Sequence, residues 1–208
     1  MKKKLMLGLL LVSLLTGCEQ KVITVAGIQT EDGQETEYIE MKEFELKTSQ
    51  VQEEDSVQYC ALLIPAGYQP SEEIEGMYVH ERSPLDSSNI YYTVSPGEEA
   101  GKVSDKLTGK IYEETVENAF AEEGWDVDLQ VESFEEIDME GVPAYKIRST
   151  YQAGEGQIEQ LTYLITADDT YTITYSQMAD DQLMADFDIS DGEIRLVRDE
   201  ESSLAKSK

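Results

Sequence analysis

The chain has 208 residues, with 44 aspartates and glutamates against 16 lysines and arginines, which gives a formal net charge of −28. This acidic balance argues against nucleic-acid binding, which depends on lysine and arginine contacts to phosphate, and against adsorption to anionic lipid headgroups. Hydrophobic residues make up 40% of the chain, which is enough for one folded core at this length. We interpret the charge mainly as a source of solubility and mutual repulsion.

The N-terminus has the pattern of an export signal. Three lysines at positions 2–4 precede an apolar run of about a dozen residues, shorter than the roughly 20 that a membrane-spanning helix needs. The run ends in Leu15-Thr16-Gly17-Cys18, which resembles the lipobox of bacterial lipoproteins. The resemblance implies that a diacylglycerol is attached to the Cys18 sulfur and that the chain is cleaved between Gly17 and Cys18. An ordinary secretory signal with a chance cysteine is the alternative.

The predicted signal peptide covers residues 1–17, and its removal changes the charge to 13 − 44 = −31, because it contains three lysines and no acid. Two or three acyl chains hold a protein stably at a membrane, since each buried methylene contributes ~0.8 kcal/mol. We therefore predict an extracytoplasmic protein that is lipid-anchored to the cell membrane through Cys18. Residues 18–35 are predicted to be a tether, residues 36–198 a single α+β domain, and residues 199–208 a disordered tail.

The first half of the domain has the pattern of strands. Residues 38–46 alternate, with a phase slip at Lys42-Glu43 that predicts a β-bulge. Residues 58–64 are almost continuously hydrophobic, which is typical of a strand buried on both faces. Cys60, within this run, is expected to be a small buried hydrophobe. Two further strands are predicted at 77–80 and 89–94.

One long amphipathic helix is predicted over residues 105–123. Ser104 is a good N-cap, and Gly124 supplies a stop. The apolar face at helical spacing consists of Leu107, Ile111, Thr115, Val116, Ala119 and Phe120. The acidic residues Glu113, Glu114, Glu117 and Glu122 are expected to lie largely away from this face.

The second half of the domain changes to period two. Strands are predicted at 127–131, 141–151, 158–166 and 170–175, and the last three should form an antiparallel meander. A short helix over 179–187 and a strand over 193–197 complete the chain. The fold class is therefore α+β, with a curled antiparallel β-sheet that is flanked by one long amphipathic helix and a short C-terminal helix.

Three segments resemble motifs of PsbP-like domains, and the resemblance covers about residues 58–197. What it implies is an α+β sandwich with a non-enzymatic, docking kind of role, and it transfers no site residue. The segments are Ala61-Leu62-Leu63-Ile64-Pro65-Ala66-Gly67-Tyr68, Glu140-Gly141-Val142-Pro143-Ala144-Tyr145-Lys146-Ile147, and Tyr171-Thr172-Ile173-Thr174-Tyr175-Ser176 followed by Phe187-Asp188-Ile189-Ser190.

The residue types that carry chemistry are sparse. His80 is the only histidine, which excludes a histidine-based triad or a multi-histidine metal site. Residues 186–197 imitate a calcium loop, but Val197 stands where a bidentate glutamate is needed. Asp126 and Asp128 share a strand face and could bind a cation weakly, although such pairs arise by chance among 44 acids. We predict no catalytic residue, no metal ligand and no cofactor.

The sequence therefore favours a membrane-anchored, non-enzymatic binding or accessory module, whose partner is an envelope protein or a small molecule. An acidic protein that binds divalent cations is the alternative, and a hydrolase that uses two facing carboxylates ranks last. Most tyrosines lie at strand periodicity and are expected to pack in the core or on a sheet face. An exposed aromatic group on the sheet would be the first place to look for a partner site.

Overall fold

A computed structural model describes residues 22–29, 36–46, 58–95, 107–178, 183, 184, 186, 187 and 193–198. The predicted signal peptide at 1–17, the lipidation site at Cys18 and the predicted tail at 199–208 lie outside these described residues.

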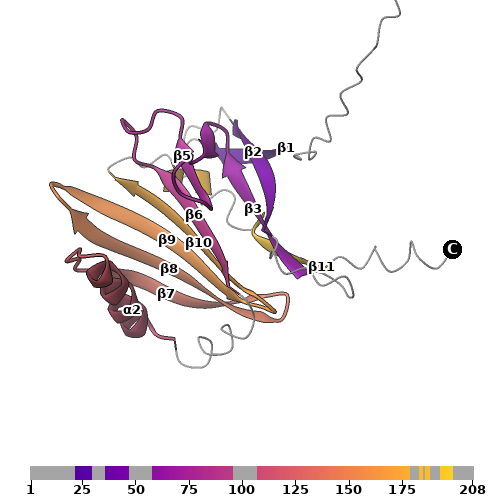
Figure 1. The fold of residues 1–208 in the computed structure, drawn as a ribbon. Coiled ribbons are helices and arrows are strands. Elements are labelled where there is room, and N and C mark those ends of the chain that lie inside the picture. The colour runs from indigo at the N-terminus through magenta and orange to yellow at the C-terminus, as the bar shows by residue number, and fades with distance from the viewer. Residues whose placement is uncertain are drawn as a thin grey trace, which may run out of the picture.

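The described chain forms two antiparallel sheets, where the sequence predicted a single curled one (Figure 1). The four-stranded sheet has the order β1-β2-β3-β11, and the seven-stranded sheet has the order β4-β5-β6-β10-β9-β8-β7. The first sheet consists of β1 (Val22–Gln29), β2 (Thr36–Leu46), β3 (Gln58–Pro65) and β11 (Arg195–Arg198). The second consists of β4 (Tyr68–Pro70), β5 (Met77–His80), β6 (Asn89–Ser95), β7 (Gln130–Met139), β8 (Val142–Ala153), β9 (Gly156–Thr166) and β10 (Thr170–Met178).

The two sheets share one hydrophobic core. Leu62 and Ile64 of β3 pack in the same cluster as Tyr163 of β9 and Ile173 of β10. All residues from 60 to 64 are buried, which confirms the prediction that this run is covered on both faces. In Figure 1 the four-stranded sheet lies on one side of the seven-stranded sheet, and α2 (Gly109–Glu122) lies on the other.

The predicted bulge at Lys42-Glu43 is wrong. The pairing of β2 with β3 runs without a break from Met41 opposite Pro65 to Leu46 opposite Cys60. The apparent phase slip has another cause, because Met41 is buried on one face of this sheet and Leu46 on the other. Glu43 lies on the same face as Met41 and is held there by an ion pair with Arg195 of β11.

The structure also corrects part of the predicted tether. Val22–Gln29 forms β1, which pairs antiparallel with β2 in a register that sets Val22 opposite Lys42 and Ala26 opposite Tyr38. Its β-branched residues fit a strand, and the pairing satisfies backbone groups of β2 that would otherwise form a sheet edge. The ordered domain therefore begins before residue 36, while 18–21 and 30–35 lie outside the described residues.

The predicted meander is confirmed as β8, β9 and β10, which are consecutive in the chain and adjacent in the sheet. Gly154 adopts a φ of 63° in the tight turn between β8 and β9, a conformation that glycine reaches without steric cost. Along β10 the residues Tyr171, Ile173 and Tyr175 are all 0% exposed. Alternate residues of a strand point to opposite faces, so this set defines the inner face of the sheet.

Helix α2 begins later than predicted, because Thr108 caps it by accepting a hydrogen bond at Oγ1 from the backbone N–H of Ile111. The predicted cap Ser104 lies outside the described residues. Gly124 ends the helix with a φ of 86°, as predicted. Glu113 and Glu117 do not point away into solvent, since their Oε1 atoms accept hydrogen bonds from the backbone N–H groups of residues 131 and 129.

The predicted C-terminal helix at 179–187 lies mostly outside the described residues, and no second helix with defined bounds is seen among those that are described. The four residues of this stretch that the structure describes have helical backbone. Leu183 and Phe187 are buried in the core as predicted.

Candidate functional site

The residues predicted for lipid attachment and cleavage, Cys18 and Gly17, lie outside the described residues. The anchor therefore stays a prediction. Within the part of the chain that the structure describes, no helix is both long and apolar enough to cross a membrane.

The position of Cys60 in β3 makes its thiol unreactive. Its side chain is buried in the shared core, and burial raises the pKa of the thiol from 9.0 to about 12. A thiol reacts as a nucleophile through its thiolate, and at neutral pH this thiol stays protonated. The prediction that Cys60 is a buried hydrophobe is confirmed.

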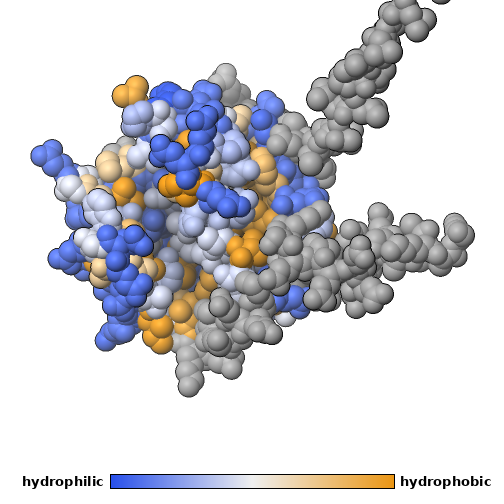
Figure 2. Space-filling model, in the orientation of Figure 1, coloured by the Kyte–Doolittle hydropathy of each residue, from blue (hydrophilic) through white to orange (hydrophobic). Residues whose placement is uncertain are grey.

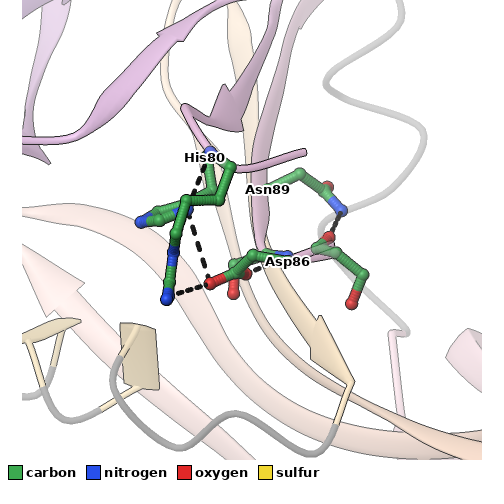
Figure 3. A network of polar contacts seen from close by, with 6 residues as sticks. His80, Asp86 and Asn89 are labelled. Carbon is green, nitrogen blue, oxygen red and sulfur yellow. Dashed lines mark hydrogen bonds and ion pairs between the residues drawn. The ribbon is translucent and has the colours of Figure 1, made fainter. Parts of the chain in front are cut away.

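His80 ends β5 and holds the loop of residues 81–88 together with Asp86 (Figure 3). The Nδ1 atom of His80 accepts a hydrogen bond from the backbone N–H of Arg82 at 3.3 Å. The Asp86 carboxylate accepts bonds from Arg82 Nη2 at 2.8 Å and from the backbone N–H of Ser88 at 3.0 Å. Asp86 is only 8% exposed, so its charge is satisfied by these partners.

This network gives His80 a structural role. Its Nδ1 atom also lies 3.4 Å from Asp86 Oδ2, so the ring is part of the same network. The ring also packs edge-on against Tyr68, with 5.2 Å between the ring centroids. Within the loop that this network holds, Leu85 is 94% exposed to solvent.

The acidic residues do not gather into a metal site within the described part of the chain, which contains no group of three or more His, Cys, Asp or Glu side chains suited to an ion. Asp126 and Asp128 are both exposed. Asp128 Oδ1 accepts a hydrogen bond from Gln130 Nε2 at 2.8 Å. Residues 188–192 of the segment that resembles a calcium loop lie outside the described set.

The surface that stands out is the outward side of three neighbouring strands, β6, β10 and β9. We call it the outer face, and all of its residues are described. Along each strand its residues alternate with those of the inner face. It lies on the side of the sheet that α2 partly covers. None of its side chains carries a charge. Its residues are Asn89, Tyr91, Thr93, Ser95, Ile158, Gln160, Thr162, Leu164, Thr166, Thr170, Thr172, Thr174, Ser176 and Met178.

Hydroxyl groups connect the outer face to α2. The Tyr112 hydroxyl of the helix donates to Thr162 Oγ1 at 3.2 Å, and Thr162 Oγ1 lies 3.2 Å from Thr174 Oγ1 on the next strand. Burial raises the pKa of Tyr112, and hydrogen bonds with Thr162 and Ser149 partly oppose that rise. The helix thus closes one side of the outer face, beyond which Thr172 and Thr174 are half-exposed.

Of the tyrosines predicted to pack in the sheet, Tyr145, Tyr171 and Tyr175 are buried, whereas Tyr91 is 36% exposed on the outer face. The other large exposed hydrophobic side chains within the described residues are Ile74, Leu85, Ile111 and Trp125. Figure 2 shows hydrophobic residues on the side of the molecule in view as small separate patches. The uncharged character of the outer face was not predicted, although the signal is present in the alternate residues of 89–95 and 170–176.

The fold and the candidate site define a small antiparallel α+β domain with two sheets, one described helix and an uncharged outer sheet face. Neither a protein-family model nor a curated protein matches the chain.

Solved structures that are similar to it include two proteins. The cyanobacterial PsbP protein (CyanoP) from Synechocystis sp. PCC 6803 is 14% identical, with 72% of this chain and 97% of that chain covered and a TM-score of 0.47. LpqN, which is involved in cell envelope biogenesis of Mycobacterium tuberculosis, is 11% identical, with 76% and 91% covered and a TM-score of 0.42. Both TM-scores are below 0.5, so the strand order and register given above define the fold.

Proposed function

We propose that the protein is a non-enzymatic binding or accessory module, held at the outer side of the cell membrane by a lipid on Cys18, and that it binds its partner through the outer face. One observation carries the proposal. The two side chains best suited to chemistry, Cys60 and His80, are committed to the core and to the 81–88 loop. The outer face, in contrast, leaves uncharged polar groups partly exposed on a sheet.

The outer face is a rigid platform, which favours binding over catalysis by moving groups. The strand β10 pairs with β9 from residue 170 to 178 and with β6 from residue 170 to 176, without a break in register. Groups that are fixed before binding lose little conformational entropy when a ligand arrives. The proposed lipid anchor retains the protein at a surface, while the net charge of −31 without residues 1–17 repels the domain from anionic lipid.

The anchor is tested by comparing the wild type with Cys18→Ser. We expect the wild-type chain in the membrane fraction, with a mass that lacks residues 1–17 and includes acyl chains. The Cys18→Ser variant should lose the acyl mass and leave the membrane fraction. A wild-type chain without acyl mass would contradict the anchor.

The binding role is tested by photo-crosslinking in intact cells. A photoreactive phenylalanine analogue is placed at Thr93 or Thr172 on the outer face, and at Thr115 on the exposed side of α2 as the matched control. We expect discrete adducts from the two outer-face positions and none from position 115. Equal adduct patterns from all three positions would contradict a binding role for this face.

The alternative of a cation-binding protein rests on the acidic composition alone. No group of candidate ligands occurs among the described residues, so no specific observation favours it. Calorimetry with calcium, magnesium and manganese at physiological salt tests it directly, and saturable binding would restore it as a candidate.

A further inference from the structure

We propose that the ligand of the outer face is an uncharged saccharide chain. This inference rests on the proposed function and names the chemical class of its partner. It follows from the composition of the face, from the spacing of its polar groups and from the position of Tyr91.

The composition of the outer face differs from that of the rest of the protein. Threonine favours strands because of its branched β-carbon, and that accounts for part of the threonine content. It does not account for the missing charge. The strand β7, two places away from β9 in the same sheet, carries Glu136 and Asp138 on the same side of the sheet as the outer face.

The polar groups of the outer face are hydroxyls and amides, which both donate and accept hydrogen bonds. A saccharide presents the same two capacities through its own hydroxyls. An anionic ligand would meet the net charge of −28, and a cation would find no carboxylate on this face. An uncharged polyhydroxylated ligand is the class that matches both properties.

The spacing of the groups suits an extended ligand. Thr172 lies opposite Thr93 in the pairing of β10 with β6, and Thr174 lies opposite Tyr91 on one side and Thr162 on the other. Neighbouring strands are about 4.8 Å apart, so Thr172 and Thr93 present hydroxyls one strand apart, whereas the Oγ1 atoms of Thr174 and Thr162 lie 3.2 Å apart. Thr170, on the same face, is nine-tenths buried, and its Oγ1 has no hydrogen-bond partner among the described residues.

Tyr91 supplies the aromatic group of the site. Its ring lies near Gly76, where an added Cβ would be 3.8 Å from the ring Cε2 and only 2.5 Å from the backbone oxygen of Tyr92. Gly76 also adopts a φ of 77°, so glycine is required at this close approach. A tyrosine ring has an apolar face and a polar hydroxyl, and the apolar face can pack against the C–H groups of a sugar ring.

The test is calorimetric titration of the full chain, solubilised in a detergent without a sugar headgroup. The probes are tetrasaccharides of glucose, mannose and N-acetylglucosamine, with tetragalacturonate as the charged counterpart. We expect saturable binding of at least one uncharged tetrasaccharide and none of tetragalacturonate. No binding of any uncharged probe at about 10 mM, or equal binding of tetragalacturonate, would overturn the inference.

Variants localise the binding. Thr172→Asp places a carboxylate on the outer face and should weaken binding about tenfold, while Tyr91→Ala should weaken it about fivefold. Thr172→Ser keeps the hydroxyl and should stay within about threefold, and Thr115→Asp adds the same charge on α2 and should stay within about twofold. Circular dichroism confirms that each variant folds, and equal losses for Thr172→Asp and Thr115→Asp would overturn the assignment to this face.

The two proposals fail in different ways. Protein adducts from positions 93 and 172 without saccharide binding would overturn the saccharide inference and support the binding role. Absence of adducts specific to these positions would instead overturn the binding role of the outer face.

Discussion

The two faces of β10 show how one strand separates stability from binding. Tyr171, Ile173 and Tyr175 point inward and are fully buried, and the ring of Tyr175 lies against that of Phe187 with 3.4 Å between centroids. Thr172 points outward, is half-exposed and lies opposite another threonine. The inner face therefore contributes most of the hydrophobic stabilisation, and partly exposed positions of the outer face such as Thr172 can change without loss of the fold. The comparison predicts different costs for substitutions one residue apart.

The largest expected effect is that of a truncation on the inner face. Tyr175→Ala removes a fully buried ring and should lower the free energy of unfolding by about 3–5 kcal/mol. Thr172→Ala removes a half-exposed side chain and should cost about 1 kcal/mol or less. Urea unfolding followed by circular dichroism measures both, and equal costs would break the distinction between the two faces.

Alkaline pH should act through the core that the two sheets share, which contains Cys60 of β3 and the tyrosines of the inner face. Burial raises the pKa of Cys60 and of Tyr78 to about 12 each, and it raises the pKa of Tyr171 and of Tyr175 as well. The unfolded chain releases these protons near the ordinary pKa values of 9.0 and 10.0, while the folded chain keeps them. The free energy of unfolding should therefore fall as the pH rises from about 9 to about 12.

The measurement is the urea midpoint at about pH 8, 10 and 11. Tyrosinate absorbance should rise together with unfolding for the buried tyrosines. Constant midpoints across this range would show that these groups can ionise within the folded protein. Thr172→Ala is the control, because its removal from the outer face should leave the pH dependence unchanged.

The same contrast explains how much of the fold could be predicted from the sequence. The meander of β8, β9 and β10 follows from alternation and from turns within one stretch of chain, so local pattern was sufficient. The second sheet was not predictable, because β11 pairs with β3 across more than a hundred residues of sequence. The strand β1 was missed for a different reason, since its run of β-branched residues at 22–25 is short and its pairing with the neighbouring β2 makes it a strand.

The candidate site was less predictable than the fold. The hydrogen bonds that Glu113 and Glu117 accept from the backbone N–H groups of residues 131 and 129 depend on where α2 lies, and no pattern along the helix predicts them. The outer face depends on strand order, because β6 becomes its neighbour only when it pairs with β10. The sequence predicted only that His80, as the single histidine, does not form a catalytic triad. Its contacts with the 81–88 loop could not be predicted.

A smaller effect tests whether polar groups outside the core also contribute to stability. Asp86→Ala leaves the backbone N–H of Ser88 and the Arg82 guanidinium without the buried carboxylate, and should cost about 1–3 kcal/mol. Arg82→Ala removes a side chain that is 60% exposed and should cost about 1 kcal/mol or less. Urea unfolding of both variants distinguishes them, and a larger cost for Arg82→Ala would contradict the central place of Asp86 in the loop.

The smallest expected effect compares the loss of one hydroxyl on each face. The Tyr163 hydroxyl is buried on the inner face and has no hydrogen-bond partner in the part of the chain described. Removing it with Tyr163→Phe should leave the free energy of unfolding unchanged or raise it, by up to about 1 kcal/mol. Thr174→Val removes a hydroxyl that lies 3.2 Å from Thr162 Oγ1 and should cost about 0.5–1.5 kcal/mol. The two changes therefore have opposite expected signs, although each removes a single oxygen. If Tyr163→Phe were the more costly of the two, the Tyr163 hydroxyl would make a hydrogen bond that its buried packing does not reveal, and the separation between a mainly hydrophobic face and a polar one would no longer hold.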